Sequence, residues 1–153
     1  MNKKIWDLYA PIYKRAMKAD QKIYDFMYER IPETVKGKEV LEIATGPGLL
    51  AKHIASAAKS MLATDYSDGM IAEAKKGEYP ANLRFEVADA MALPYEDNSF
   101  DVVLIANAAD GLFINRILRC DITDVIIGSG LYSEQEVLLF RAKRGTGSTS
   151  PKR

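Results

Sequence analysis

The chain has 153 residues, of which 48% are hydrophobic and 27% are charged, a balance typical of a soluble globular domain. Lys plus Arg and Asp plus Glu both number 21, so no net charge favours nucleic acid or an anionic membrane surface. The single cysteine, Cys120, excludes an intramolecular disulfide and fits a reducing compartment. Because no signal peptide opens the chain and no apolar run approaches the roughly 18 residues of a membrane span, we expect a cytoplasmic protein.

Residues 1–31 carry apolar side chains at helical spacing. Pro11 is expected to break or kink this pattern, which predicts two short helices with the second beginning near Asp20. Pro32 and Gly37 indicate the linker that follows. The expected organisation is a helical segment over 1–37, one α/β domain over 38–140 and a basic, flexible tail over 141–153.

The stretch over residues 40–50 reads Val-Leu-Glu-Ile-Ala-Thr-Gly-Pro-Gly-Leu-Leu. Its apolar run indicates a buried strand, and its glycines indicate a tight turn into a helix that begins near Leu49. Gly46 and Gly48 permit positive φ and carry no Cβ that would hold a ligand away. Since the helix start adds its N–H groups and its positive dipole end, the stretch predicts a nucleotide-like pocket.

The next segments alternate between helix and strand patterns, which predicts a mostly parallel α/β sheet. The strand predicted over 102–106 is continuously apolar and rich in β-branched residues, as a strand that is covered on both faces must be. The expected elements are a helix over 49–60, a strand over 61–64, a helix capped by Ser67, and strands over 83–88 and 102–106. Beyond residue 107 the pattern weakens to a helix or strand over 112–118, a strand over 125–127 and a helix over 133–140.

Polar and glycine positions follow each predicted strand, and parallel strands bring such positions to one edge of a sheet. Asp65 follows the glycines by about 20 residues, the spacing of an acid that accepts from ribose hydroxyls. Asp89 can accept from an adenine amino group, with the backbone of Ala90 beside it. The positions that converge are Gly46, Gly48, Asp65, Asp89 and Asn107.

These motifs, taken in register over about residues 38–107, resemble the class I S-adenosylmethionine-dependent methyltransferases, close to their small-molecule and quinone-type branch. The family's acid-x-Gly-x-Gly-x-Gly motif reads here from Glu42 to Gly48, with Ala44 in place of the first glycine. The resemblance implies a Rossmann-like fold, S-adenosylmethionine as cofactor and a small-molecule methyl acceptor. It implies neither a metal nor an identified catalytic residue.

The resemblance also assigns positions around the cofactor. Asp65 would bind the ribose, Tyr66 and Met70 would flank the adenosyl group, Asp89 and Ala90 would meet the adenine, and Asn107 would lie near the methyl group. The segment over 9–13 is similar to the same branch, which makes Tyr9 and Tyr13 candidate substrate contacts in a helical lid. The alternative is that these tyrosines pack the helices onto the domain.

Two other nucleotide-binding folds fit the sequence less well. Residues 46–51 also satisfy the G-x-G-x-x-A pattern of a dinucleotide oxidoreductase, which does not account for Glu42 or for Asp89 and Ala90. A P-loop is excluded because no Gly-Lys-Ser/Thr follows the turn.

The residues after Asn107 do not follow the family's usual continuation, which predicts an incomplete C-terminal half. An open sheet edge there would favour a homodimer. A second functional hypothesis is therefore a non-catalytic, S-adenosylmethionine-binding or interaction protein that derives from a methyltransferase.

Overall fold

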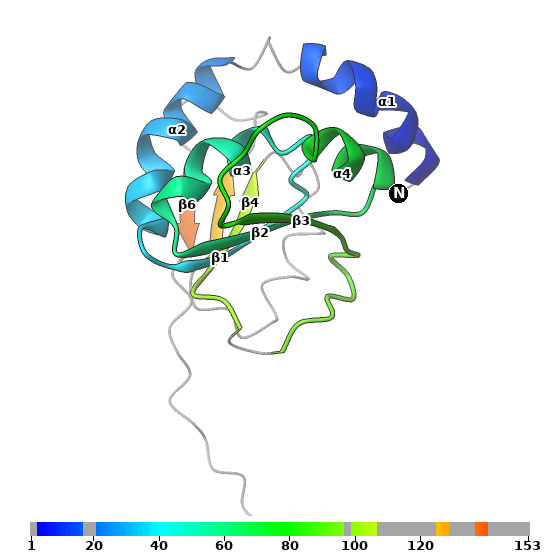
Figure 1. Ribbon diagram of the computed structural model, residues 1–153. Helices are drawn as coiled ribbons and strands as arrows, with labels where there is room; N and C mark the ends of the chain where they lie inside the picture. The colour runs from blue at the N-terminus through cyan, green and yellow to red at the C-terminus, as the bar shows by residue number, and fades with distance from the viewer. Residues whose placement is uncertain (1–2, 17–20, 97–98, 107–124, 129–136, 141–153) are drawn as a thin grey trace, which may run out of the picture.

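The computed structural model describes residues 3–16, 21–96, 99–106, 125–128 and 137–140, the last two segments as backbone only. Two helices precede the sheet, α1 over Lys3–Ala16 and α2 over Gln21–Val35. The expected pair of N-terminal helices is confirmed, and α2 begins one residue after Asp20. Both helices lie on the same side of the sheet (Figure 1).

A six-stranded sheet forms the centre of the fold, in the order β3-β2-β1-β4-β5-β6. The first five strands are parallel, and β6 runs antiparallel to β5. Because β1 pairs with both β2 and β4, the chain reverses its direction of travel across the sheet beside β1, where open α/β sheets bind ligands. The strands are β1 Glu39–Ile43, β2 Ser60–Asp65, β3 Leu83–Val87, β4 Val102–Ala106, β5 Val125–Gly128 and β6 Val137–Phe140.

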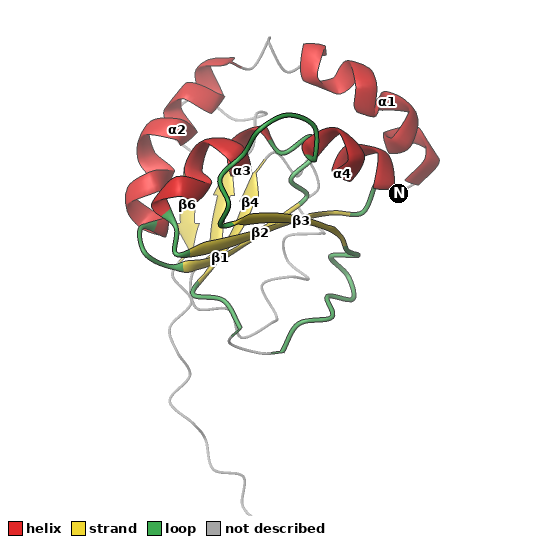
Figure 2. Ribbon diagram, in the orientation of Figure 1, coloured by secondary structure: helices red, strands yellow, loops and turns green. Residues whose placement is uncertain are grey.

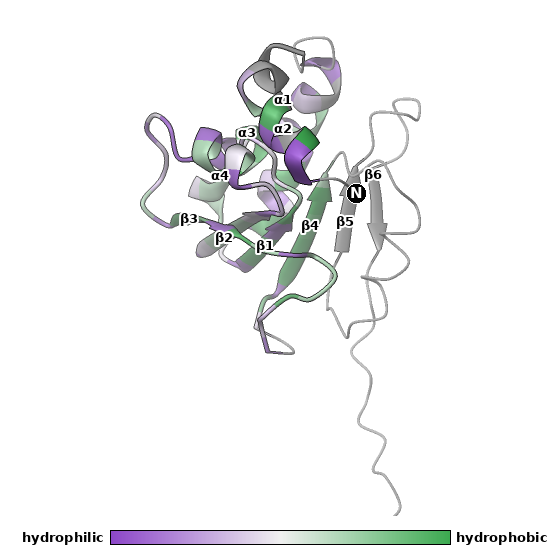
Figure 3. Ribbon diagram, turned by 90° about the vertical axis from the view of Figure 1, so that its right-hand side faces the viewer, coloured by the Kyte–Doolittle hydropathy of each residue, from purple (hydrophilic) through white to green (hydrophobic). Residues whose placement is uncertain are grey.

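Side chains of β4 alternate between two hydrophobic layers, because successive residues of a strand point to opposite faces. Val102, Leu104 and Ala106 join the layer under the helices, whereas Val103 and Ile105 join the layer on the other face. All five residues are buried, and Figure 3 shows β4 as hydrophobic along most of its length. The expectation of a strand covered on both faces is confirmed.

The described helices all lie on one face of the sheet (Figure 2). Helix α3 over Leu49–Ile54 leads into the short 3₁₀ helix η2 over Ala55–Ala57, and α4 covers Asp68–Ala74. The opposite face is packed by the loop after β3, through Ala90, Leu93, Tyr95 and Phe100. The two faces are therefore covered by different kinds of structure.

Three expected element boundaries are wrong. The helix predicted over 49–60 ends its α-helical part at Ile54, because the chain must turn back into β2, and Ala58 is already extended at ψ 159°. Pro11 does not break α1, and α2 passes Pro32 to end at Val35. One proline removes a single helical hydrogen bond, and the remaining bonds and the buried face of α2 outweigh that loss.

The C-terminal part gives a mixed outcome. The strand expected over 125–127 is confirmed as β5, but residues 137–140 form strand β6 instead of the end of a helix. The run Val-Leu-Leu-Phe has no polar face for an amphipathic helix and pairs with β5 instead. The segments over 112–118 and 133–136 and the tail over 141–153 lie outside the described residues, so an incomplete C-terminal half stays a prediction.

Within the described ranges, every helix is too short or too polar to cross a membrane.

Candidate functional site

The turn after β1 is held in the left-handed backbone region, as the glycines predicted. Gly46 has φ 57° and Gly48 has φ 72°. Ala44 also has φ 58° and is the one described non-glycine residue with positive φ. Since a side chain in this region costs about 1–2 kcal/mol, the alanine in the first motif position carries strain that a glycine would not.

Besides the expected positive φ, Gly48 is required for packing, which the sequence did not indicate. A Cβ built on this residue would lie 2.6 Å from Cε1 of Phe85 in β3 and 3.1 Å from Cβ of Ala74 in α4. The bare backbone of Gly48 therefore lets the start of α3 approach β3 and α4 closely. In the structure, this glycine makes room for Phe85.

Glu42 is the deepest ionisable group of the site. It is 1% exposed, and its Oε2 accepts a hydrogen bond of 2.6 Å from the Thr45 hydroxyl. Burial raises the pKa of Glu42 to about 7, with the bond from Thr45 opposing the rise and the charge of Asp65 adding to it. This carboxyl group can therefore hold or release a proton near neutral pH.

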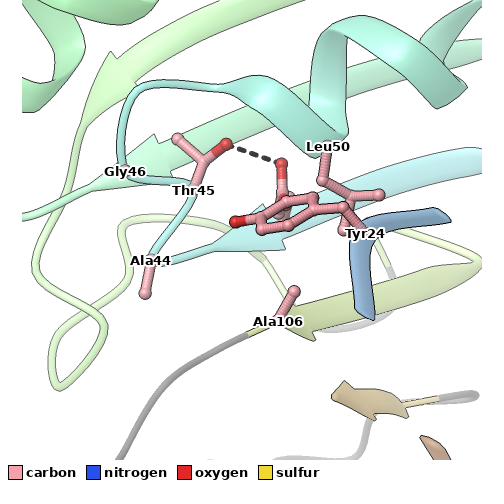
Figure 4. A pocket seen from close by; sticks show the side chains of 7 residues that line it. Tyr24, Ala44, Thr45, Gly46, Leu50 and Ala106 are labelled. Carbon is pink, nitrogen blue, oxygen red and sulfur yellow. Dashed lines mark hydrogen bonds between the residues drawn. The ribbon is translucent and has the colours of Figure 1, made fainter. Parts of the chain in front are cut away.

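A small cavity of about 30 Å³ lies beside Glu42, which is enough for one water molecule. The ring of Tyr24 from α2 crosses it, and Leu50 of α3 and Ala106 of β4 line its sides (Figure 4). Ala44, Thr45 and Gly46 complete the lining. The cavity thus lies at the carboxyl ends of β1 and β4, on the face that the helices cover.

Asp65 connects the end of β2 to the glycine turn. Its Oδ2 accepts the backbone N–H of Gly46 at 2.9 Å, and its Oδ1 accepts that of Ser67 at 2.9 Å. Burial raises the pKa of Asp65, although the bonds from Ser67, Gly46 and Tyr66 work against that rise. Because a carboxylate has about four lone-pair sites and three backbone N–H groups bond to this one, it can accept one further hydrogen bond from a ligand hydroxyl.

The residues after Asp65 build the start of α4. Ser67 caps the helix as expected, since its Oγ accepts the N–H of Met70 at 3.1 Å. Met70 is buried, whereas Tyr66 is 47% exposed and lies under the ammonium of Lys3, 5.3 Å from its ring centroid. Tyr66 therefore offers an accessible aromatic face beside Asp65, whereas the side chain of Met70 is part of the core.

Asp89 and Ala90 lie after β3 at the same edge of the sheet. Asp89 is exposed, and its Oδ1 accepts the N–H of Met91 at 2.9 Å. Ala90 packs against the hydrophobic layer on the face opposite the helices. The N–H of Ala88 donates to the carbonyl of Asp65 at 3.0 Å, which ties this loop to the end of β2.

Three expected site residues cannot be placed. Asn107 lies outside the described residues. Tyr9 and Tyr13 lie in α1, but their side chains are not described. Among the described residues, no group of three or more His, Cys, Asp and Glu side chains is arranged to hold a metal ion.

The sequence-based interpretation missed Tyr24, Thr45 and Asp7. Tyr24 could have been suspected from its place on an aromatic helix face, and Thr45 from its place three residues after the motif acid. Asp7 gave no sequence signal, because its two partners, Ser67 and Gly69, lie about 60 positions away.

Comparison with known proteins agrees with this geometry. The family model described as a methyltransferase domain matches residues 40–119. Demethylmenaquinone methyltransferase of Renibacterium salmoninarum is 39% identical over 72 residues, which cover 47% of this chain and 30% of the relative. The ubiquinone/menaquinone biosynthesis C-methyltransferase of Geotalea uraniireducens is 33% identical over 122 residues, which cover 70% of this chain and 51% of the relative.

The chain thus spans about a third to a half of the length of these two relatives. Among solved structures, the chain of the DhpI–SAM–HEP complex has a TM-score of 0.68 at 21% identity. The match covers 81% of this chain and 62% of that one. At this level of identity the likeness shows a shared fold, the Rossmann-like α/β sheet that the sequence predicted.

Proposed function

The chain belongs to the family of methyltransferase domains, and we propose that it binds S-adenosylmethionine and transfers its methyl group to a small-molecule acceptor. One observation carries the proposal. The Gly46 N–H and the Asp65 carboxylate are hydrogen-bonded at 2.9 Å, at the strand edge where this fold class binds nucleotides. The buried carboxyl group of Glu42 lies at the end of the neighbouring strand β1.

The donor set of the site fits this cofactor. Asp65 would accept from a ribose hydroxyl with its remaining lone-pair site, and Tyr66 would offer its exposed ring to the adenosyl group. Glu42 and its small cavity would favour a cationic end group, since such a group stabilises a carboxylate that burial otherwise protonates. We propose that five further residues shape the remaining walls of the cofactor site: Ala44, Gly46, Gly48, Asp89 and Ala90.

Bound S-adenosylmethionine would supply an electrophilic methyl group on a positively charged sulfur. The chain's own residues would orient that group and exclude water from it. Tyr24 of α2 narrows the space over Glu42, and Tyr9 and Tyr13 of α1 are proposed to contact the acceptor. No residue is assigned as a general base.

The named relatives suggest the acceptor class. Two of them methylate quinone precursors according to their names, so a demethylated quinone is the first acceptor to test. We also propose a cytoplasmic location, the domain limits 38–140, and a homodimer whose mass would be measured by light scattering. Asn107 and a helical lid over 1–37 remain part of the proposed site.

Calorimetric titration with S-adenosylmethionine and its demethylated product tests the function. Binding in the micromolar range, about −8 kcal/mol, is expected for the wild type, with no binding of NAD. Asp65→Asn should weaken it by at least about tenfold, because a charged acceptor becomes a neutral one.

Asp101→Asn is the matched control. Asp101 also accepts a backbone N–H, that of Glu39 at 2.8 Å, but at the opposite end of β1. Equal losses in both variants would refute a specific role for Asp65, and no binding by the wild type would refute the proposed function. Binding without turnover on any quinone precursor would favour the non-catalytic alternative.

A further inference from the structure

The carboxylate of Asp7 in α1 contacts the start of α4. Oδ1 of Asp7 accepts the Ser67 hydroxyl at 2.5 Å and the Gly69 N–H at 3.1 Å. These bonds hold the pKa of Asp7 below its usual range, with the Ser67 bond as the larger cause. Asp7 is therefore ionised at neutral pH and joins two segments that are 60 positions apart.

The contact is close enough to involve the backbone. A Cβ built on Gly69 would lie 2.9 Å from Cα of Asp7 and 3.1 Å from its carbonyl oxygen. Pro11, four residues after Asp7, has no N–H to donate to that carbonyl. The backbones of α1 and α4 are therefore in close contact at this point, and a larger residue at position 69 would push α1 away.

Ser67 lies between Asp7 and the proposed ribose acid. Its hydroxyl donates to Asp7, while its backbone N–H donates to Oδ1 of Asp65 at 2.9 Å. The side chain of Ser67 is also buried. Any displacement of Ser67 that follows the loss of Asp7 would therefore move the donor that fixes the Asp65 carboxylate.

We propose that Asp7 is a positioning residue for cofactor binding: by fixing Ser67 and Gly69, it fixes the Asp65 carboxylate, so ligand affinity at the sheet edge depends on α1. This inference rests on the proposed function, because its affinity readout uses the demethylated cofactor product, S-adenosylhomocysteine. It assigns α1 a role in the cofactor site through a residue that touches no cofactor.

The experiment compares variants of the full chain by titration with S-adenosylhomocysteine. Asp7→Ala removes the acceptor, and Asp7→Asn keeps an oxygen that can accept from Ser67 and Gly69. Asp68→Asn is the matched control, because Asp68 also bonds to α1, through Lys3 at 2.6 Å, without contacting Asp7 or Asp65. Circular dichroism of each variant establishes that it is folded.

Asp7→Ala should weaken binding about tenfold, whereas Asp7→Asn and Asp68→Asn should stay within about threefold of the wild type. A merely structural role would weaken binding regardless of the residue at position 65. If Asp7 acts through Asp65, adding Asp7→Ala to Asp65→Asn should cost less than about twofold more. Wild-type affinity in Asp7→Ala, or a full tenfold further loss in the double variant, would overturn the inference.

Amide exchange provides a readout without ligand. Asp7→Ala should speed exchange at the amides of Ser67 and Gly69, and also at that of Gly46, because the Asp65 carboxylate that accepts the Gly46 N–H would lose its fixed position. If the wild type binds no S-adenosylhomocysteine, the proposed function fails and this readout decides the inference. Unchanged exchange at Ser67, at Gly69 or at Gly46 would then overturn it, and faster exchange at all three would sustain it.

Discussion

The Thr45 hydroxyl donates to the Glu42 carboxyl group over 2.6 Å, and both side chains are buried at the carboxyl end of β1. In water the Glu42 carboxyl group would carry a full negative charge. In the fold it is buried, with the Thr45 hydroxyl as a described hydrogen-bond donor. Its protonation state is therefore coupled to the stability of the fold.

Glu42→Gln should make the protein more stable in a pH-dependent way. The pKa of Glu42 is raised from 4.5 to about 7, so the folded state binds a proton that the unfolded state has released. Stability of the wild type then falls as pH rises from about 4.5 to about 7, by roughly 3 kcal/mol in total. Urea unfolding near pH 5 and near pH 8 should show an advantage for Glu42→Gln that grows by about 2 kcal/mol. A pH-independent difference would contradict this account.

Thr45→Val tests the same pair from the other side. It preserves the shape of the side chain and removes the one bond that lowers the pKa of Glu42. Near pH 8 the variant should lose about 1–3 kcal/mol, because a buried charge loses its donor. In the Glu42→Gln background the loss should shrink. Equal losses in both backgrounds, measured by urea unfolding, would show that Thr45 acts independently of Glu42.

Gly48→Ala should destabilise the fold by about 2–4 kcal/mol, through positive φ and overlap with Phe85 together. Gly77→Ala is the control, since Gly77 has φ 76° but nothing within 4 Å of an added Cβ. That change should cost only about 1 kcal/mol. Phe85→Leu should recover part of the Gly48→Ala loss in thermal unfolding. If both glycine variants lose equally, the contact with Phe85 carries no energy.

Ala44→Gly should stabilise the protein by up to about 1 kcal/mol, because it relieves a left-handed alanine. The same change at Ala72, an exposed residue inside α4, should instead cost about 1 kcal/mol. Opposite signs for one chemical change would establish the strain at Ala44. Destabilisation by Ala44→Gly would mean that the packing of the Ala44 methyl group on the sheet contributes more free energy than the relief of backbone strain.

The local sequence pattern predicted most of the part of the fold that contains strands β1 to β4. The β4 strand was delimited correctly because an uninterrupted apolar run allows few alternatives, and the Ser67 cap was correct because its side-chain bond is local. The helix predicted over 133–140 failed at residues 137–140, where pairing with β5 is a non-local effect. The helix-breaking effect of Pro11 and Pro32 was overestimated: α1 continues through Pro11, and in α2 the packing of the buried face compensates for the bond lost at Pro32.

The candidate site was predicted in part for the same reason. Glu42, Gly46 and Asp65 meet because parallel strands end at one edge, which a sequence pattern conveys. The ring of Tyr24 over Glu42 and the bonds from Asp7 depend on how two helices lie across the sheet. No spacing rule specifies that placement, so these contacts could be found only in three dimensions.

The unequal covering of the two sheet faces has a consequence for local opening. On one face, Leu41 and Ile43 are shielded by the loop after β3, whose Leu93, Tyr95 and Phe100 pack there without a helix among the described residues. The backbone bonds within that loop are those of turns, from the Ala92 N–H to the Asp89 carbonyl and from the Ser99 N–H to the Glu96 carbonyl. Segments of this kind open at lower free energy than packed helices. Because Ala44 belongs to the same layer, opening of the loop would remove packing from the residue that begins the glycine turn.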